Sequence, residues 1–273
     1  MEDRGNTAVT VLIPHFQTLD SIKLCLRSLR KFTRQPCLVR VLDNGSRDAS
    51  LDYLRAVPWI ELVTTGCTNH CWKAHFEALN AAVPLVTTPY FLLMHSDTYV
   101  HHPGWLDYLL DLARTGYAAV GPRHQRVPVR TPLWLPSAVL QHLRVRELAP
   151  GVPALRSFCA LYETAPFRQL GCRFSTANSL DITCEVNEQL VRAGHRIRGL
   201  SAFALSRYLF HASAITLIAQ GIQPVAREQT KDACERGASY VDHKTYRRSQ
   251  NCQQRFLQLA STRAILADDT LDR

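Results

Sequence analysis

Short apolar runs alternate with amphipathic stretches along the chain up to about residue 115. The runs are rich in β-branched residues and stop at turn-forming residues, which is typical of buried strands. The stretches between them repeat apolar positions at helical spacing. This alternation predicts βαβ units and an α/β domain with a mostly parallel central sheet. Strands are expected at 8–13, 37–42, 59–63, 89–94 and 118–121, and helices at 18–32, 48–54, 71–82 and 104–114.

The second half of the chain has a less regular pattern. Residues 122–157 are rich in proline and arginine, and they predict a long loop or lid with an amphipathic helix around 138–148. Residues 181–193 have an apolar helical face followed by a glycine stop. A strand is expected at 196–200, charged helices from residue 214 onward, and a frayed end over residues 264–273.

The composition is that of a folded domain. The 273 residues are 46% hydrophobic and 20% charged, which allows one large domain or a domain with an appendage. No window approaches the roughly 18 uninterrupted apolar residues of a spanning helix, and the first residues lack a secretory pattern. Nine cysteines without a disulfide framework favour free thiols, and Cys67 with Cys71 forms at most half of a zinc site. We therefore expect a cytoplasmic protein.

The net charge of +9 raises the question of an anionic partner. The basic residues collect mainly in 123–146 and 227–263, without a recognition-helix or RNA-binding signature. No nucleic acid is therefore expected. A solvated surface, a phosphorylated substrate, or peripheral contact with the inner face of a membrane remain open.

Two carboxylates follow predicted strands at the point where each strand ends. Asp43 follows 37–42, and Asp97 follows 89–94. The carboxyl ends of parallel strands meet at one edge of a sheet, where ligands of open α/β sheets bind. Asp97 either holds a divalent metal against a phosphate or caps the next turn, and spacing alone leaves both open.

The same edge carries groups suited to a nucleotide diphosphate. Asp43 can accept a hydrogen bond from a base or a ribose, and Phe16, after the first strand, offers an aromatic face. The glycine-rich phosphate-binding fingerprints are absent from the sequence. A metal would therefore have to supply the counter-charge for the phosphates.

A set of motifs follows in order along the chain. They are Val11-Leu12-Ile13-Pro14-His15-Phe16-Gln17, Asp43-Asn44-Gly45-Ser46-Arg47-Asp48, His75-Phe76-Glu77-Ala78-Leu79-Asn80, His95-Ser96-Asp97, and Leu190 to Ile197 followed by Phe210-His211. They resemble the I-P-x-Y-N strand, the D-N-x-S-x-D turn, the H-G-x-A-L-N helix, the D-x-D site and the acceptor-side helix and distal histidine of family-2 glycosyltransferases with the GT-A fold. The resemblance covers roughly residues 8–215.

The resemblance implies a particular domain organisation. It predicts a single GT-A type, Rossmann-like domain over residues 1–215, with a donor half at about 1–121 and an acceptor half at about 122–215. Residues 216–273 would form a helical extension packed on that domain.

The resemblance also implies roles for residues at the strand ends. Asp97 would hold Mn²⁺ or Mg²⁺ on the donor diphosphate, and His211 would complete the metal site. His95 replaces the first carboxylate of the D-x-D motif, and we expect it to contact the diphosphate or the ribose. The nucleotide would be held by Pro14, Phe16, Asp43 and Ser96.

The position of the catalytic base departs from the family pattern. In register with the Leu190 helix, that position falls on Thr183, which cannot serve. Asp181 lies two residues earlier and is our prediction for the base, with Glu185 and then Glu163 as alternatives. The other interpretation of Asp181 is a capping residue for the helix that follows.

These roles predict an inverting transfer of a sugar from a UDP- or dTDP-sugar. The base would take the proton from an acceptor hydroxyl on a glycan, a lipid-linked sugar or a small molecule. The missing D-x-D carboxylate and the displaced base keep an alternative open, which is a non-catalytic nucleotide-sugar-binding protein.

Overall fold

The computed structural model describes residues 7–65, 72–125, 127, 147–149, 152–175, 181–211, 213–219, 221–226 and 241–273. The expected half zinc site at Cys67 and Cys71, and most of the basic stretch 123–146, lie outside these residues. The cysteines whose side chains the structure describes are free thiols, as expected: Cys25, Cys37, Cys159, Cys172 and Cys184.

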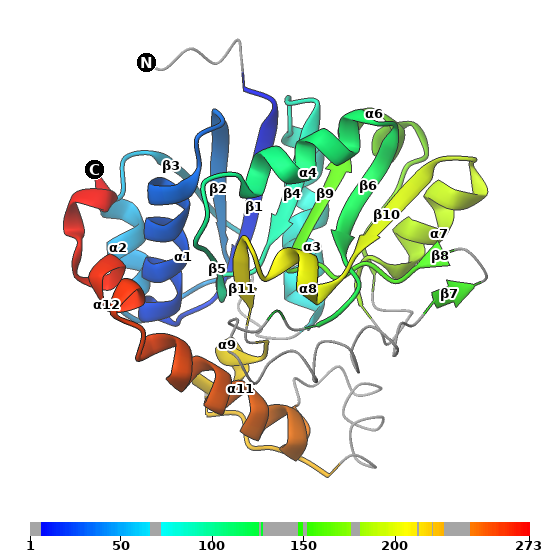
Figure 1. Ribbon diagram of the computed structural model, residues 1–273. Helices are drawn as coiled ribbons and strands as arrows, with labels where there is room; N and C mark the ends of the chain where they lie inside the picture. Colours follow the sequence, from blue (N-terminus) through cyan, green and yellow to red (C-terminus); the bar gives the residue numbers. More distant parts are fainter. Residues whose placement is uncertain are drawn as a thin grey trace.

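Seven strands of the described residues form one twisted sheet in the order β10-β6-β9-β4-β1-β2-β3 (Figure 1). Within it β9 runs antiparallel to both of its neighbours, and the other pairs are parallel. The predicted α/β fold with a mostly parallel sheet is therefore confirmed. The strands are β1 (Val9–His15), β2 (Cys37–Asp43), β3 (Ile60–Thr64), β4 (Tyr90–Met94), β6 (Tyr117–Pro122), β9 (Cys159–Glu163) and β10 (Arg196–Leu200).

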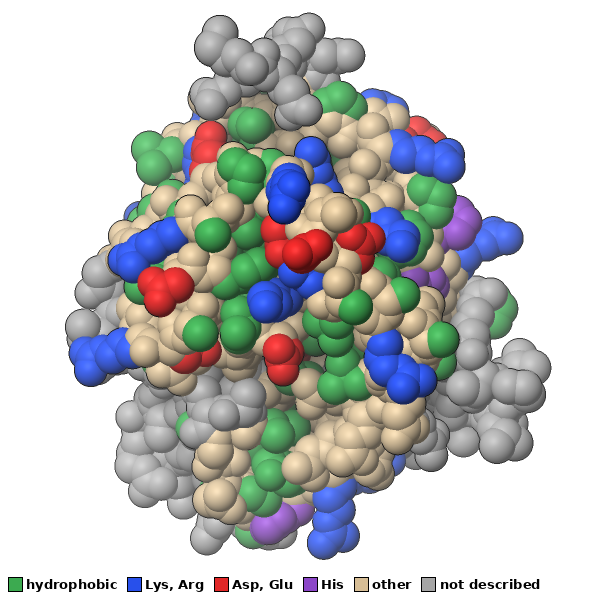
Figure 2. Space-filling model, turned by 90° about the vertical axis from the view of Figure 1, so that its left-hand side faces the viewer, with side chains coloured by type: hydrophobic (Ala, Val, Ile, Leu, Met, Phe, Trp, Pro, Cys, Tyr) green, Lys and Arg blue, Asp and Glu red, His purple; other side chains and the backbone are tan. Residues whose placement is uncertain are grey.

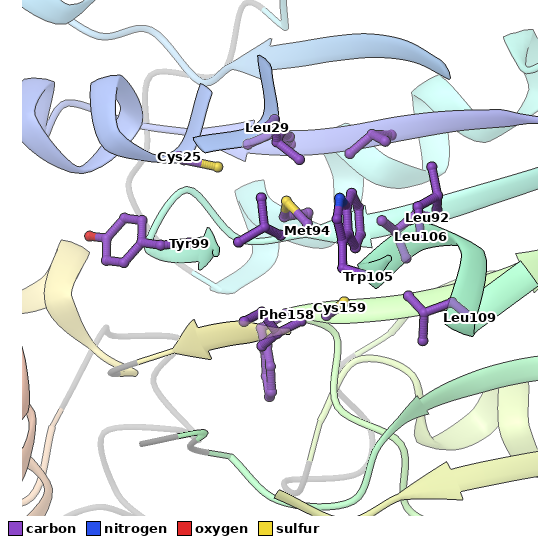
Figure 3. Packing of buried hydrophobic residues seen from close by; sticks show 14 of the residues in the cluster. Cys25, Leu29, Leu92, Met94, Tyr99, Trp105, Leu106, Leu109, Phe158 and Cys159 are labelled. Atoms are coloured by element: carbon purple, nitrogen blue, oxygen red, sulfur yellow. The ribbon is translucent and has the colours of Figure 1, made fainter. Parts of the chain in front are cut away.

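Helices cover both faces of the sheet because alternate strand residues point to opposite sides. Val11 and Leu92 pack in one apolar cluster with α1 and α4, whereas Leu12 and Leu93 pack in a second cluster with α3 and α7. In Figure 3, Trp105 of α4 lies beside Met94 and Leu92 of β4. The helices are α1 (Leu19–Phe32), α2 (Ala49–Ala56), α3 (Trp72–Ala82), α4 (Trp105–Arg114), α6 (Thr164–Gln169), α7 (Cys184–Arg192) and α8 (Ala202–Leu205), with a 3₁₀ turn η2 (Val83–Leu85).

Strand β9 was absent from the sequence prediction, and it corrects one site residue. It enters the sheet between β4 and β6 and runs against β4, with Glu163 opposite Tyr90 and Cys159 opposite Met94. Asp97 follows Met94, so Glu163 lies at the other edge of the sheet. Glu163 as an alternative base is therefore wrong.

The first strand continues through Pro14, where the sequence predicted its end. The His15 carbonyl accepts from the Asn44 amide on the β2 side, so the Pro14 nitrogen faces the β4 side of the strand. Pairing with β4 ends at Leu12. A proline is tolerated beyond that point because no ladder hydrogen bond requires its missing N–H.

Two short strand pairs lie beside the main sheet. Strands β5 (Thr98–Val100) and β11 (Leu209–His211) are antiparallel partners. Strands β7 (Glu147–Ala149) and β8 (Val152–Pro153) form the other pair. The helix expected around 138–148 falls mostly outside the described residues, and its described end is the strand β7 instead.

The C-terminal part is helical, as expected, but its end does not fray. Helix α9 (Ile215–Ala219) is followed in the described chain by α11 (His243–Leu257), α12 (Ala260–Ala267) and the 3₁₀ turn η4 (Asp269–Asp272). In Figure 1, α11 and α12 run along the lower left of the molecule to α1. Arg27 Nε donates to Asp272 Oδ1 at 2.9 Å, and the Tyr53 hydroxyl donates to the same oxygen at 2.7 Å. A buried cation therefore fixes the tail.

Asp272→Ala is expected to lower the free energy of unfolding by about 2–3 kcal/mol, because Arg27 is only 4% exposed and would lose its carboxylate partner. The measurement is urea unfolding, with Asp269→Ala, an exposed acid in the same turn, as the matched control. Equal stability of the two variants would contradict the role of the ion pair.

The same pair gives stability a pH dependence. Burial raises the pKa of Asp272, but hydrogen bonds from Arg27 and Tyr53 and the charge of Arg27 outweigh it and hold the pKa below its usual value. The pair therefore stabilises the fold above the ordinary aspartate pKa of about 3.9, and this contribution is lost as the pH falls below it. The difference between Asp272→Ala and the wild type is expected to shrink in that range.

Two sequence-based expectations concern the charge of the surface and the lack of a membrane-spanning helix, and the described residues bear on both. In Figure 2, basic and acidic side chains are interspersed on the face that carries the C-terminal helices, without a patch of one sign. Among the described helices, none combines the length and the apolar character needed to cross a membrane.

Candidate active site

The predicted strand ends do meet at one edge of the sheet. His15 at the end of β1 pairs with Asp43 at the end of β2, and β4 on the other side of β1 leads directly into residues 95–97. The main-chain carbonyl of Asp43 is held by the Thr65 amide at 2.9 Å. This topology places Asp43 and Asp97 at the same edge of the sheet, as the sequence predicted.

Three potential metal ligands gather at this edge: His95, Asp97 and His211. One ligand atom from each lies within 4.8 Å of the others. The His211 Nε2 atom is 3.2 Å from Asp97 Oδ1, and the His95 Nδ1 atom is 4.0 Å from the same oxygen. His211 reaches the cluster because β11 pairs with β5, the strand that directly follows Asp97. Residues more than a hundred positions apart thus share one small volume.

Each histidine of this cluster is held at its far ring nitrogen. His211 Nδ1 lies 2.7 Å from the Gln125 carbonyl oxygen and must carry the proton to donate to it. His95 Nε2 lies 3.0 Å from Ser157 Oγ. Fixing the outer nitrogen in this way is how proteins orient imidazole ligands of a metal, because the inner lone pair is then aimed at the ion.

The inner nitrogen of His211 lacks a hydrogen bond in the described part of the chain, although the side chain is 1% exposed. A neutral His211 would direct its Nε2 lone pair at a carboxylate oxygen, and two acceptors repel each other. A proton on Nε2 or a cation between the two atoms removes this conflict. The arrangement therefore fits a divalent cation held by Asp97 and His211.

The charge states of the cluster fit the same role. Burial alone would raise the pKa of Asp97, but the charge of His211 and its contact, then His95 and the Ile215 amide, lower it to about 2. Burial lowers the pKa of His95 well below its usual value. His75 lowers it further, whereas the charge of Asp97 opposes this shift. The cluster thus offers an ionised carboxylate and a neutral imidazole, the forms that bind metals.

Asp43 has one oxygen in use and one open. Its Oδ2 accepts from the Gly45 amide at 3.2 Å and from the Ser46 amide at 3.1 Å, which closes the turn after β2. Its Oδ1 is buried and has no hydrogen-bond partner among the described residues. An open acceptor of this kind suits a ligand N–H or O–H group. Phe16 is half-buried just beyond β1, and Pro14 and Ser96 are buried.

His15 is a residue of this edge that the sequence analysis left without a role. Its Nε2 lies 2.9 Å from Ser50 Oγ, and Asp48, the N-cap of α2, accepts from both the amide and the hydroxyl of Ser50. Burial lowers the pKa of His15 to about 4, although Asp43 and Asp48 oppose this. The sequence feature that could have pointed to His15 is its position directly after Pro14, at the end of the first strand. Its neutral ring ties the end of β1 to α2.

Strained backbone flanks the edge on two sides. Among the described residues other than glycine, positive φ angles occur at Gln17, Thr18, Ser213 and Ala214. The first two follow β1, and the last two follow His211. The Ile215 amide, next in the chain, donates to Asp97 Oδ2 at 3.3 Å. Strain of about 1–3 kcal/mol per residue persists only where surrounding contacts enforce it, and it clusters at ligand sites.

The two predicted base residues have different surroundings. Asp181 is buried, and both of its carboxylate oxygens lie 3.3 Å from the Ser157 amide that donates to them. Burial raises the pKa of Asp181, while the charge of Arg156 and the Ser157 amide oppose the rise. Glu185 lies half-buried in the first turn of α7. Ser157 also contacts His95, so it connects Asp181 to the cluster.

Ser157, Phe158 and Gln125 are contacts that the sequence analysis missed. The Phe158 ring stacks on the His211 ring with 3.9 Å between centroids. The Phe158 carbonyl accepts from the His95 amide at 3.2 Å. These residues precede β9 or follow β6, and their motif-free sequence carried no signal of a site. Only the unrecognised strand β9 brings them to this edge.

A family profile matches this chain over residues 10–171, and its description is Glycosyl transferase family 2. The match covers more than half of the sequence. It includes all of β1 but its first residue, β2, β4, and the cluster residues His95 and Asp97, whereas His211 lies outside it. The chain belongs to this family and has the GT-A fold, so it is a glycosyltransferase. The resemblance noted in the sequence is confirmed.

Solved structures share the fold at low sequence identity. Residues 1–349 of TarS from S. aureus match at 16% identity with a TM-score of 0.54, covering 94% of this chain and 73% of that one. The mannosyltransferase PcManGT from Pyrobaculum calidifontis, solved with GDP-Man and Mn²⁺, matches at 15% identity and 0.52, covering 97% and 79%. TarS 1–349 with UDP-GlcNAc matches at 16% and 0.50, covering 96% and 71%. A comparison with curated protein sequences found no match.

Proposed function

We propose that this glycosyltransferase moves a sugar from a nucleoside-diphosphate donor to an acceptor hydroxyl, with inversion and with a divalent metal at the donor diphosphate. The observation that carries the proposal is the His95, Asp97 and His211 cluster at the sheet edge that also holds the open Asp43 oxygen. Metal ligands and a nucleoside acceptor at one edge suit a nucleotide sugar.

Asp97, His211 and His95 would hold the metal. From the family resemblance we expected His95 to contact the diphosphate or the ribose, but its Nδ1 atom lies in the cluster, 4.0 Å from Asp97 Oδ1. We therefore assign it as a third ligand in place of the missing carboxylate. When bound, the metal would stabilise the negative charge on the leaving nucleoside diphosphate.

The donor atoms favour one of the two predicted cofactors. Two imidazole nitrogens and one carboxylate oxygen suit a transition-metal ion, whereas Mg²⁺ prefers oxygen ligands and water. Mn²⁺ is thus the better candidate, and the fold relative PcManGT was solved with Mn²⁺.

Asp43 and Phe16 would hold the nucleoside. The open, buried Oδ1 of Asp43 would accept from the imide N–H that uracil and thymine share, which fits a UDP- or dTDP-sugar. Phe16, half-buried beyond β1, would cover a face of the base, with Pro14 and Ser96 completing the surroundings. The related structures contain GDP-Man and UDP-GlcNAc, so both nucleobases belong in any test.

Asp181 would act as the base for the acceptor hydroxyl. Burial raises its pKa, which is the direction of shift that favours a general base. Glu185 is the alternative because it is a half-buried carboxylate in the first turn of α7, one turn after Asp181 in the chain. The acceptor would lie over the half of the domain from about 122 to 215, and residues 216–273 would form the extension that packs on it.

A thermal-shift panel of UDP, dTDP and GDP, each with and without Mn²⁺, tests donor binding. A nucleotide at a hundredfold excess over its Kd is expected to stabilise the wild type by about 2.7 kcal/mol. Asp43→Asn is expected to weaken binding about tenfold, because the open carboxylate oxygen contributes a charge-assisted hydrogen bond of about 1.5 kcal/mol or more.

Asp52→Asn, an exposed acid on α2, is the matched control for this panel and should respond like the wild type. Equal nucleotide affinity in Asp43→Asn would remove Asp43 from the proposal. Stabilisation without turnover of any donor sugar would favour the non-catalytic binding protein.

A further inference from the structure

The strand pair β5 and β11 has two distinct faces. His211 lies opposite Thr98, and Phe210 lies opposite Tyr99. Successive side chains of a strand point to opposite sides, so the His211 face is turned toward the cluster and the aromatic face is turned away. The Thr98 hydroxyl donates to the Phe158 carbonyl at 3.1 Å, which fixes that face toward the site.

A ring from the C-terminal helices covers the aromatic face. Phe256, near the end of α11, stacks on Phe210 with 4.2 Å between centroids and 8° between ring planes. It also stacks on Tyr99 with 5.0 Å and 6°. Tyr99 and Phe210 are themselves nearly parallel at 6.0 Å. One side chain thus contacts both strands directly behind the cluster.

The helix that carries Phe256 is anchored on the far side of the molecule. Helix α12 follows it after a short turn, and Ile265 of α12 lies in the same apolar cluster as Leu24 of α1. The buried Arg27 then binds the tail through Asp272. Phe256 is therefore held from behind by α1, and the strand pair is held by Phe256.

A cavity lies beside the stacked rings of Tyr99 and Phe256. A cavity of about 410 Å³ is bounded by α1, β5 and the C-terminal helices, and both Tyr99 and Phe256 line it. If the Phe256 ring were removed, Tyr99 and Phe210 would face this open space. The strand pair could then shift, and the 3.2 Å approach of His211 to Asp97 would no longer be enforced.

We propose that Phe256 is a positioning residue for the metal site, acting through Tyr99 and Phe210 on Asp97 and His211. This role rests on the proposed metal function of the cluster. It gives the C-terminal helices a part in the reaction, because the packing of α11 sets the spacing of two ligands that lie on other elements.

The test is Mn²⁺ binding measured by electron paramagnetic resonance on the full chain, without any substrate. Phe256→Ala is expected to weaken Mn²⁺ binding about 10- to 100-fold, the usual cost of losing a residue that supports metal ligands. Phe256→Tyr keeps the flat ring and should restore binding to near the wild-type affinity. Phe167→Ala of α6 is the matched control, because it removes a buried aromatic ring of the same size from the second apolar cluster, away from Tyr99 and Phe210.

The outcomes separate this role from stability and from the proposed function. Weak Mn²⁺ binding in Phe256→Ala with normal binding in Phe167→Ala, at comparable melting temperatures, would support the role. Wild-type affinity in Phe256→Ala would overturn it alone, as would a loss that follows the melting temperature equally in both variants. A wild type that binds no Mn²⁺ would overturn both the role and the metal site.

Discussion

Asp97→Asn is expected to lower metal-dependent turnover about 10³-fold, which corresponds to about 4 kcal/mol of transition-state stabilisation. Asp97 supplies the carboxylate oxygen that both histidines of the cluster face, at 3.2 Å from His211 and 4.0 Å from His95. The amide keeps the size of the side chain and an oxygen for the Ile215 amide, so the fold should persist. The charge that binds the metal is lost.

The measurement for Asp97→Asn is the rate of nucleoside diphosphate release from UDP- and dTDP-sugars across a range of Mn²⁺ concentrations. Asp111→Asn, an exposed acid on α4, is the control. Nucleotide binding in the absence of metal should be little changed, because Asp43 lies on another strand. Near-normal turnover at the same Mn²⁺ concentration would mean that Asp97 is a turn residue.

Asp181→Asn is expected to lower turnover about 10²- to 10⁴-fold, the usual contribution of a general base. Donor binding should be almost intact, because Asp181 lies in the half of the domain that we propose to bind the acceptor. The substitution also tests a second role, since the Ser157 amide that donates to Asp181 belongs to a residue that contacts His95.

The Mn²⁺ titration separates these two roles of Asp181. Loss of a base lowers kcat and leaves the Mn²⁺ concentration for half-maximal activity unchanged, whereas loss of a positioning contact raises that concentration. Glu185→Gln is the companion variant, with the same change of charge one turn further along the chain. A large loss in Glu185→Gln with near-normal Asp181→Asn would transfer the role of base to Glu185.

Much of the fold could be predicted because local patterns and global topology agree. The mainly apolar run at 37–42 became β2, and the apolar helical face at 181–193 became α7. The missed strand β9 shows the limit. Its residues are a short apolar run without flanking turn signals, and its antiparallel place between β4 and β6 depends on contacts from distant parts of the chain.

The site could be predicted only where it follows strand ends. Asp43 and Asp97 stand at such ends, and the family motifs pointed to His211. The contacts that orient the cluster, from Gln125 and Ser157, come from segments without a recognisable pattern. The prediction of a frayed C-terminal end was wrong for a similar reason. The partner of Asp272, Arg27, lies 245 positions away in the sequence.

The most direct test of the whole account is the release of nucleoside diphosphate by the wild type from UDP-, dTDP- and GDP-sugars, with Mn²⁺, after EDTA treatment, and after Mn²⁺ is restored. The account predicts turnover of at least one donor with Mn²⁺, its loss with EDTA and its recovery on adding Mn²⁺ back. Turnover that EDTA leaves unchanged, or binding of a donor without any release of nucleoside diphosphate, would contradict it.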